Sequence, residues 1–334
     1  MIEISHLVKK YGDHIAVNDL TLTVEPGKIY GFLGPNGAGK STTMNIITGY
    51  LGATSGEVKI NGFDIFAQPE EAKKCVGYLP EIPPLYVDMT VREYLNFVAE
   101  LKKLEKGRRN KYVEEAMVTT GITAQQSRLI RNLSKGYRQR VGFAQAVLGY
   151  PEIIILDEPT VGLDPKQIIE IRELIRQLAK KHTVILSSHI LAEVREVCDY
   201  ILIISKGKLV ASDTPENLER NLGDSDLIEI ETKADPDEVR RILETVDGIR
   251  SISTKHLENG ITWAQIQEKK NTDVREKVFQ AFAQNHQPLL KLNPLQVSLE
   301  DVFMELTQSD RAAEEYAEKA KKKETEDMKD AGDL

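Results

Sequence analysis

The sequence predicts an α/β protein in which a large, mainly parallel layer is followed by a small α+β domain. Residues 1 to about 208 alternate apolar, strand-like runs with segments of helical periodicity, the pattern of a parallel sheet covered by helices. Residues 227 to about 306 follow the order βαββαβ, which is typical of a ferredoxin-like domain. Turn-forming residues between the two halves predict a linker over 211–226.

Composition and charge exclude several classes of protein. The 334 residues carry 44 Lys plus Arg and 52 Asp plus Glu, a formal net charge of −8, and 41% are apolar, so the chain is globular. The acidic balance argues against nucleic acid as a partner, which requires a basic surface. No apolar run approaches the roughly 18 residues of a membrane helix, and the first residues lack a signal-peptide pattern. Cys75 and Cys198 have no metal or redox spacing and indicate ordinary thiols of a reducing compartment.

Three short apolar strands organise the first domain, at Lys28–Leu33, Ile153–Leu156 and Thr183–Ser187. Each ends just before residues with chemical side chains, as expected where ligands bind at the carboxyl ends of parallel strands. Asp164-Pro165 supplies an N-cap and an N1 proline for a following amphipathic helix. A hairpin is predicted over 201–210.

The second domain is predicted to consist of seven elements. They are strand 227–232, helix 235–246, strand 249–256, strand 261–267 after a Glu258-Asn-Gly turn, helix 272–285, strand 288–293 and helix 298–306. We divide the chain into domains over 1–225 and 226–308 and a charged, flexible tail over 309–334, for which binding of a partner is the alternative. The second domain carries no phosphate-binding, metal or nucleophile motif, which predicts a structural or regulatory role.

The strongest motif is a complete G-x-x-x-x-G-K-[ST] phosphate loop between the first strand and a helical run that begins at Lys40. Its glycines allow backbone N–H groups to face phosphate oxygens at a helix N-terminus. In this motif Lys40 contacts the β and γ phosphates, and Ser41 offers its hydroxyl to Mg²⁺. The predicted nucleotide-binding residues of the loop are Gly34, Pro35, Asn36, Gly37, Ala38, Gly39, Lys40, Ser41 and Thr42.

Two carboxylates follow the apolar strand Ile153–Leu156. Asp157 at the strand end offers a fixed anion for Mg²⁺ beside the phosphate loop. Glu158 points elsewhere and is positioned to polarise an attacking water. Without the phosphate loop, such a pair is more often a solvated strand end, so the functional interpretation depends on both motifs together.

A third element, Leu133-Ser-Lys-Gly136, leads into a helix predicted over Val141–Leu148. Ser134 is a good N-cap, and a helix start with free N–H groups also attracts anions. Alone this signal is weak, because most caps are only caps.

Together these motifs resemble the ATP-binding cassette (ABC) ATPases. The phosphate loop, Leu-Ser-x-Gly, Leu-Asp-Glu-Pro, Gly162-Leu-Asp164 and an isolated His189 occur in that family's order over residues 1 to about 225. The resemblance implies ATP hydrolysis with ATP and Mg²⁺, on a P-loop NTPase fold whose RecA-like core carries antiparallel β and helical subdomains.

The resemblance also assigns individual roles. Tyr11 would stack on adenine, and Glu81 would occupy the Q-loop position, near the metal. Ser134 and Gly136 would contact the γ-phosphate bound by a partner subunit, Asp164 would form the D-loop, and His189 would be the switch histidine. Without the resemblance, a lone His after a strand is more often a structural residue and Tyr11 is more often a packing residue, so both roles depend on the resemblance.

Two positions depart from the family pattern. Glu81 replaces the usual Gln, and the signature reads Ser-Lys-Gly-Tyr instead of Ser-Gly-Gly-Gln. These features, with a C-terminal Ser298-Leu-Glu-Asp-Val-Phe, resemble the ATPase subunits of ABC type-2 exporters of the gliding-motility and multidrug branches. That resemblance implies a homodimer that closes around two ATP·Mg²⁺ and drives a separate transmembrane permease at the cytoplasmic face of the cell membrane.

Two other functions compete with this interpretation. A soluble ABC ATPase acting on ribosomes or nucleic acid is disfavoured by the single cassette and the acidic charge. A small-molecule kinase does not explain Leu133–Gly136 or Leu156–Asp164. Apolar residues within 82–100 would line a groove for a permease helix, although core packing explains them equally well. They are Pro83, Pro84, Leu85, Tyr86, Met89, Tyr94 and Phe97.

Overall fold

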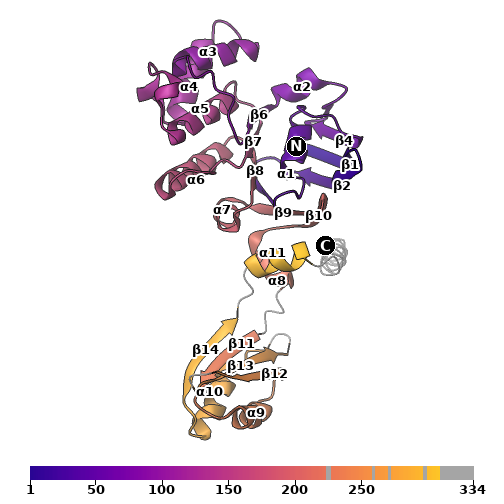
Figure 1. The fold of residues 1–334 in the computed structure, drawn as a ribbon, viewed down its shortest axis with the longest axis vertical. Coiled ribbons are helices and arrows are strands. Elements are labelled where there is room, and N and C mark those ends of the chain that lie inside the picture. Colours follow the sequence, from indigo (N-terminus) through magenta and orange to yellow (C-terminus); the bar gives the residue numbers. More distant parts are fainter. Residues whose placement is uncertain (223–226, 258–259, 270–271, 296–298, 309–334) are drawn as a thin grey trace, which may run out of the picture. The chain divides into compact units, whose positions relative to one another are not determined.

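The computed structural model describes residues 1–222, 227–257, 260–269, 272–295 and 299–308 (Figure 1). It divides into two compact units, one holding Met1–Pro215 together with the described residues 305–308, the other holding Glu216–Met304. The division after Pro215 comes before the expected boundary at 225/226. Residues 309–334, Ser298 and the Glu258-Asn part of the expected turn lie outside the described residues.

The first unit begins with an antiparallel sheet in the strand order β2-β1-β4-β5. Its strands are β1 (Ile2–Tyr11), β2 (His14–Val24), β4 (Ser55–Ile60) and β5 (Phe63–Asp64). The alternation of apolar and polar residues in β1 buries Ile2 and Ile4 on one face, where they join the core of the central sheet. This sheet is the antiparallel subdomain that the ABC resemblance implies.

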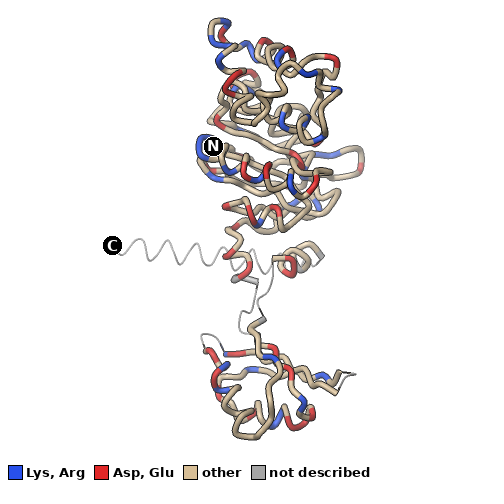
Figure 2. Tube along the Cα trace, turned by 90° about the vertical axis from the view of Figure 1, so that its left-hand side faces the viewer, with Lys and Arg blue, Asp and Glu red and all other residues tan. Residues whose placement is uncertain are grey.

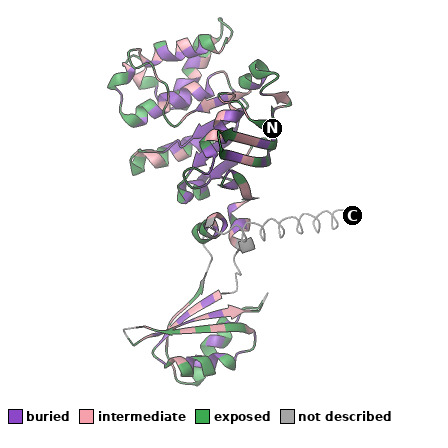
Figure 3. Ribbon diagram, turned by 45° about the vertical axis from the view of Figure 1, so that its right-hand side comes forward, coloured by how far each residue is buried: buried purple, intermediate pink, exposed green. Residues whose placement is uncertain are grey.

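The central sheet has the order β10-β9-β3-β8-β7-β6 and is parallel except for its edge strand β10. Its strands are β3 (Ile29–Leu33), β6 (Val76–Leu79), β7 (Ile153–Asp157), β8 (Thr183–Ser188), β9 (Tyr200–Ser205) and β10 (Lys208–Asp213). Every residue of β3, β7 and β8 is buried (Figure 3), because helices and the N-terminal sheet cover both faces. The three predicted strands are confirmed to within one residue, and the 201–210 hairpin is β9–β10.

Helices α1 (Lys40–Ile47), α2 (Pro69–Lys74), α6 (Pro165–Ala179) and α7 (Leu191–Val197) belong to the same unit. A separate group of helices, α3 (Val91–Leu101), α4 (Arg109–Thr119) and α5 (Lys135–Val147), forms the helical subdomain, with short 3-10 turns at Thr123–Gln125 and Ile130–Asn132. Helix α5 begins at Lys135, earlier than the helix predicted over Val141–Leu148. Its predicted cap Ser134 is confirmed, since the Ser134 hydroxyl accepts a hydrogen bond from the N–H of Tyr137.

The second unit has the strand order β12-β13-β11-β14, with every neighbouring pair antiparallel, as in ferredoxin-like domains. Its elements are α8 (Pro215–Leu222), β11 (Leu227–Thr232), α9 (Pro236–Glu244), β12 (Ile249–His256), β13 (Thr262–Glu268), α10 (Arg275–Gln284), β14 (Leu289–Leu295) and α11 (Leu299–Gln308), of which α8 and α11 extend into the first unit. Strand residues such as Ile230 and Ile266 pack against Val239 and Phe282 of the helices.

None of the helices within the described ranges combines the length and the apolar character needed to cross a bilayer.

Candidate active site

The phosphate loop leaves β3 and ends in the first turn of α1. Gly37 and Gly39 have left-handed backbones, with φ of 82° and 102°. A Cβ atom on Gly39 would lie 2.4 Å from the carbonyl oxygen of Ala16, and one on Gly34 would lie 2.5 Å from the carbonyl oxygen of Ile204. The loop therefore requires glycine at these positions, both for its curvature and for the close approach of neighbouring backbone.

Lys40 is buried at the start of α1, with 6% of its surface exposed. Its ammonium group donates hydrogen bonds to the carbonyl oxygens of Gly34 at 2.7 Å and Pro35 at 3.3 Å. Burial lowers the pKa of Lys40, and the nearby carboxylates of Glu158 and Asp157 oppose that change. A cation held in this way by its own loop is well placed to receive an anionic phosphate oxygen.

Asp157 lies at the carboxyl end of β7 and is 4% exposed. Its carboxylate accepts hydrogen bonds from the hydroxyls of Ser187, at the end of β8, and Ser41, 3.4 Å away. Magnesium is usually bound by one or two protein oxygens, and waters and substrate phosphates complete its coordination. Ser41 and Asp157 would supply the protein oxygens. Within the described ranges no cluster of three or more His, Cys, Asp or Glu could hold a metal without such a substrate.

Glu158 and His189 form the second pair of the site. The Glu158 side chain accepts a hydrogen bond from Nδ1 of His189, and the two atoms are 2.9 Å apart. Glu158 has a left-handed φ of 47°, and its N–H donates a hydrogen bond to the Ser187 hydroxyl at 3.0 Å. Because of this backbone conformation, the Glu158 side chain points in a different direction from that of Asp157. Burial raises the pKa of Glu158, while His189 and Lys40 lower it. A carboxylate with a raised pKa is a better proton acceptor near neutral pH.

An open cleft of about 380 Å³ brings these groups together. It is lined by Tyr11, His14, Ala16, Asn36, Gly37, Gly39, Lys40, Ser41, Thr42, Glu81, Glu158, Val161 and His189. Tyr11 is 49% exposed, with the ammonium of Lys9 5.1 Å from its ring centroid. The predicted residues Gly34, Pro35, Ala38 and Asp157 are not among those that line this cleft.

His14 lines the cleft and was not predicted. The two-residue Gly12-Asp13 turn between β1 and β2 pairs Tyr11 with His14. Alternating runs on both sides of a short turn were the signal that could have identified this neighbour.

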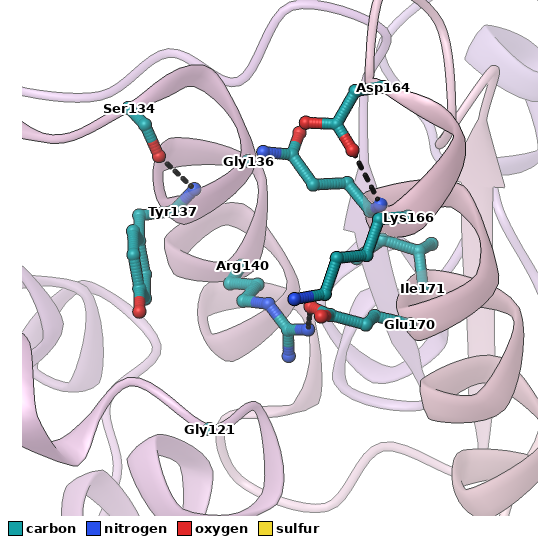
Figure 4. Close-up of a pocket in the computed structure, with 10 residues that line it drawn as sticks. Gly121, Ser134, Gly136, Tyr137, Arg140, Asp164, Lys166, Glu170 and Ile171 are labelled. Carbon is teal, nitrogen blue, oxygen red and sulfur yellow. Dashed lines mark hydrogen bonds and ion pairs between the residues drawn. The ribbon is translucent and has the colours of Figure 1, made fainter.

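Ser134, Gly136 and Asp164 line a different cleft of about 340 Å³, between the N-terminal ends of α5 and α6 (Figure 4). The other residues of this cleft are Gly121, Tyr137, Arg140, Lys166, Gln167, Glu170 and Ile171. The Asp164 carboxylate accepts a hydrogen bond from the N–H of Gln167 at 2.9 Å, so Asp164 caps α6 as predicted. None of the described residues lines both clefts, and one chain alone therefore presents its predicted residues in two separate groups.

Comparison with known proteins agrees with this geometry. A family described as "ABC transporter" matches residues 17–161. The chain is 40% identical over 212 residues to the bacitracin transport ATP-binding protein BcrA of Bacillus licheniformis, covering 63% of this chain and 68% of BcrA. It is 30% identical to the linearmycin resistance ATP-binding protein LnrL of Bacillus subtilis, covering 92% and 98% of the two chains.

Solved structures agree in fold. The structure of an ATP-binding subunit of an ABC transporter superimposes with a TM-score of 0.61 at 31% identity, covering 67% of this chain and 93% of that one. A bacterial ABC transporter cassette, solved as a dimer, gives a TM-score of 0.59 at 25% identity over 64% and 98%. The chain is an ATP-binding, ATP-hydrolysing cassette and belongs to the ABC transporter family.

Proposed function

We propose that this chain is the nucleotide-binding subunit of an ABC type-2 exporter, in which two copies close head to tail around two ATP molecules and drive a separate transmembrane permease. The observation that carries the proposal is the separation of the motifs into two clefts. Lys40 lies in one cleft and Ser134 in the other, so a complete site requires the first cleft of one chain and the second cleft of its partner. Relatives named for bacitracin transport and linearmycin resistance support export as the direction.

In each site the phosphate loop and Lys40 would bind the β and γ phosphates, and Tyr11 would stack on adenine. Ser41 and Asp157 would hold Mg²⁺, with Glu81 near it, and the metal when bound neutralises charge on the phosphates. Ser134 and Gly136 of the partner subunit would contact the γ-phosphate from the opposite side, with Asp164 at the junction. Closure would then be favoured only when ATP bridges the two surfaces.

Hydrolysis would use the Glu158 carboxylate to accept a proton from the attacking water. His189 would hold that carboxylate in place through its hydrogen bond to Oε2. Because every chain carries Lys40, Asp157, Glu158 and His189, a homodimer has two competent sites.

The acidic limb of the pH profile tests the role of Glu158. Protonated Glu158 cannot accept a proton, so ATPase activity should fall as the pH drops through the pKa of Glu158, at a pH above the ordinary value of 4.5. His189→Gln removes the main group that lowers this pKa, so the acidic limb of its residual activity should move to higher pH. Initial rates across the acidic range, with circular dichroism to follow folding, measure both. An acidic limb that stays in place in His189→Gln contradicts the assignment.

The proposed permease-binding surface surrounds α3. Of the segment 82–100, Tyr94 is a core residue with 2% of its surface exposed, whereas Tyr86 is 55% exposed and packs edge-on against Phe97, with ring centroids 5.3 Å apart. At the other end of α3, Leu101 and Leu104 line an open cleft of about 800 Å³, whose rim also carries Lys and Glu side chains. Apolar surface at both ends of one helix supports a helix of the permease as the partner.

Affinity purification from native membranes tests this surface. Tagged Glu158→Gln with ATP should recover a polytopic permease, and adding Tyr86→Glu should reduce that recovery about tenfold, since a charge is placed in an apolar contact. In the otherwise wild-type chain, Tyr86→Glu should leave basal ATPase within about twofold. Val118→Glu is the matched control, because Val118 is an exposed apolar residue on α4 outside this surface.

Equal recovery with Tyr86→Glu would contradict this surface, whereas loss of folding in that variant would favour core packing for this segment. Recovery of ribosomes or nucleic acid in place of a permease would favour the alternative function. Against that alternative, Lys and Arg residues are interspersed with Asp and Glu along the chain (Figure 2), and the net charge is −8.

We further propose a peripheral location at the cytoplasmic face of the membrane, and a structural or regulatory role for the ferredoxin-like unit.

A further inference from the structure

A buried carboxylate outside the nucleotide cleft joins the two loops that carry the proposed catalytic pair. Glu193 lies in the first turn of α7, where the neighbouring buried residues Leu191 and Val194 are apolar, and only 5% of its surface is exposed. A buried carboxylate is costly unless polar partners satisfy it, so its contacts indicate what it does.

Glu193 accepts hydrogen bonds from two buried hydroxyls through the same oxygen, Oε2. The Thr160 hydroxyl is 2.5 Å away, and the Ser188 hydroxyl is 3.3 Å away. Thr160 and Ser188 are 4% and 1% exposed, so water does not compete for these hydroxyls.

Each hydroxyl belongs to a different functional loop. Thr160 lies between Glu158 and Asp164, and the backbone around it is closed by hydrogen bonds from Val161 to the Glu158 carbonyl and from Leu163 to the Thr160 carbonyl. Ser188 directly precedes His189, and its hydroxyl accepts a hydrogen bond from the N–H of Ile190 at 3.0 Å. This hydrogen bond joins the residues on either side of His189. The 2.9 Å contact between Glu158 and His189 thus depends on two loops that Glu193 connects.

We propose that Glu193 is a positioning residue for ATP hydrolysis, which acts through Thr160 and Ser188 to hold the Glu158–Asp164 loop against the His189 loop. It does not line the nucleotide cleft, so it contributes to the rate of hydrolysis and not to ATP binding. The inference rests on the roles proposed above for Glu158 and His189. It also links Asp164, at the proposed dimer surface, to the catalytic pair.

Kinetics of four single variants test the inference. Glu193→Ala and Thr160→Val each remove the Thr160–Glu193 hydrogen bond and should lower kcat about ten- to hundredfold, with KM for ATP within about twofold of wild type. Thr160→Ser keeps the hydroxyl and should retain kcat within about twofold. Glu196→Ala is the matched control: Glu196 is on the same helix, but pairs with Arg172, and its loss should leave kcat unchanged.

The double variant Glu193→Ala/Thr160→Val should be no slower than the slower single variant, because both changes break one interaction. Thr160→Val is close in volume to the natural residue, so it tests the inference even if Glu193→Ala does not fold. A wild-type kcat in Thr160→Val overturns the inference, as does a parallel loss of kcat, ATP affinity and melting temperature, which would mark a purely structural role. The Glu158→Gln variant distinguishes failure of the proposed function from failure of this inference. ATP turnover by Glu158→Gln refutes the proposed function. An inactive Glu158→Gln variant together with a wild-type kcat in Thr160→Val refutes only the positioning role of Glu193.

Discussion

Replacing Glu158 with Gln is expected to lower ATP turnover by about 10²- to 10⁴-fold while ATP still binds, because the amide keeps the shape of the side chain but cannot accept a proton. The phosphate loop, Lys40 and Asp157 are untouched by this change. ATP should therefore remain bound between two chains, and the closed dimer should accumulate. Burial raises the pKa of Glu158, which means that the charged carboxylate is disfavoured at this position. A neutral Gln adds no desolvation cost there, so the variant should fold normally.

Phosphate release and size-exclusion chromatography with and without ATP measure both consequences. Glu152→Gln is the matched control, because Glu152 precedes the same strand, β7, at its other end and pairs with Asn61 away from the cleft. It should hydrolyse ATP at the wild-type rate and form no trapped dimer. Undiminished hydrolysis by Glu158→Gln would remove Glu158 from the mechanism.

Lys40→Ala and Ser134→Arg should each abolish hydrolysis, but through different defects. Loss of the buried Lys40 ammonium should weaken ATP binding by about 2–5 kcal/mol, since a desolvated contact between opposite charges is removed. Ser134→Arg places a bulky cation in the second cleft, away from the phosphate loop of its own chain, so it should prevent this cleft from contacting the γ-phosphate of the ATP that a partner binds. Its own chain should still bind ATP within about twofold of wild type.

Binding of a fluorescent ATP analogue and phosphate release distinguish the two defects. Ser134→Thr keeps the capping hydroxyl and serves as the control for the substitution in the second cleft. Loss of nucleotide binding in Ser134→Arg would mean that Ser134 belongs to the site of its own chain.

Much of the nucleotide cleft follows from local sequence patterns. Short apolar runs predict β3, β7 and β8, and parallel strands necessarily end at one edge, so Lys40, Asp157 and Glu158 had to meet. The phosphate loop is equally local, because its glycines are required by positive φ at Gly37 and Gly39. In the same way, βαββαβ order was enough to predict the ferredoxin-like sheet.

Other features depend on contacts that periodicity does not encode. Glu193 and Thr160 are separated by 33 residues, and on α7 a glutamate among apolar residues has the pattern of an ordinary solvent-facing position. His14 enters the cleft only because a tight turn pairs β1 with β2. The helix predicted over Val141–Leu148 is shorter than α5, because the first turns of α5 are polar and lack apolar spacing, although Ser134 is correctly predicted as its cap.

Mixing two inactive variants tests most directly whether the active site is shared between two chains. A heterodimer of Lys40→Ala with Ser134→Arg contains one site with an intact phosphate loop from the Ser134→Arg chain and an intact signature from the Lys40→Ala chain. Its other site carries both defects. Shared sites therefore predict that the heterodimer, once isolated by its two different tags, has up to about half of the wild-type ATPase rate. Heterodimers that form and remain as inactive as either variant alone would contradict sites shared between chains.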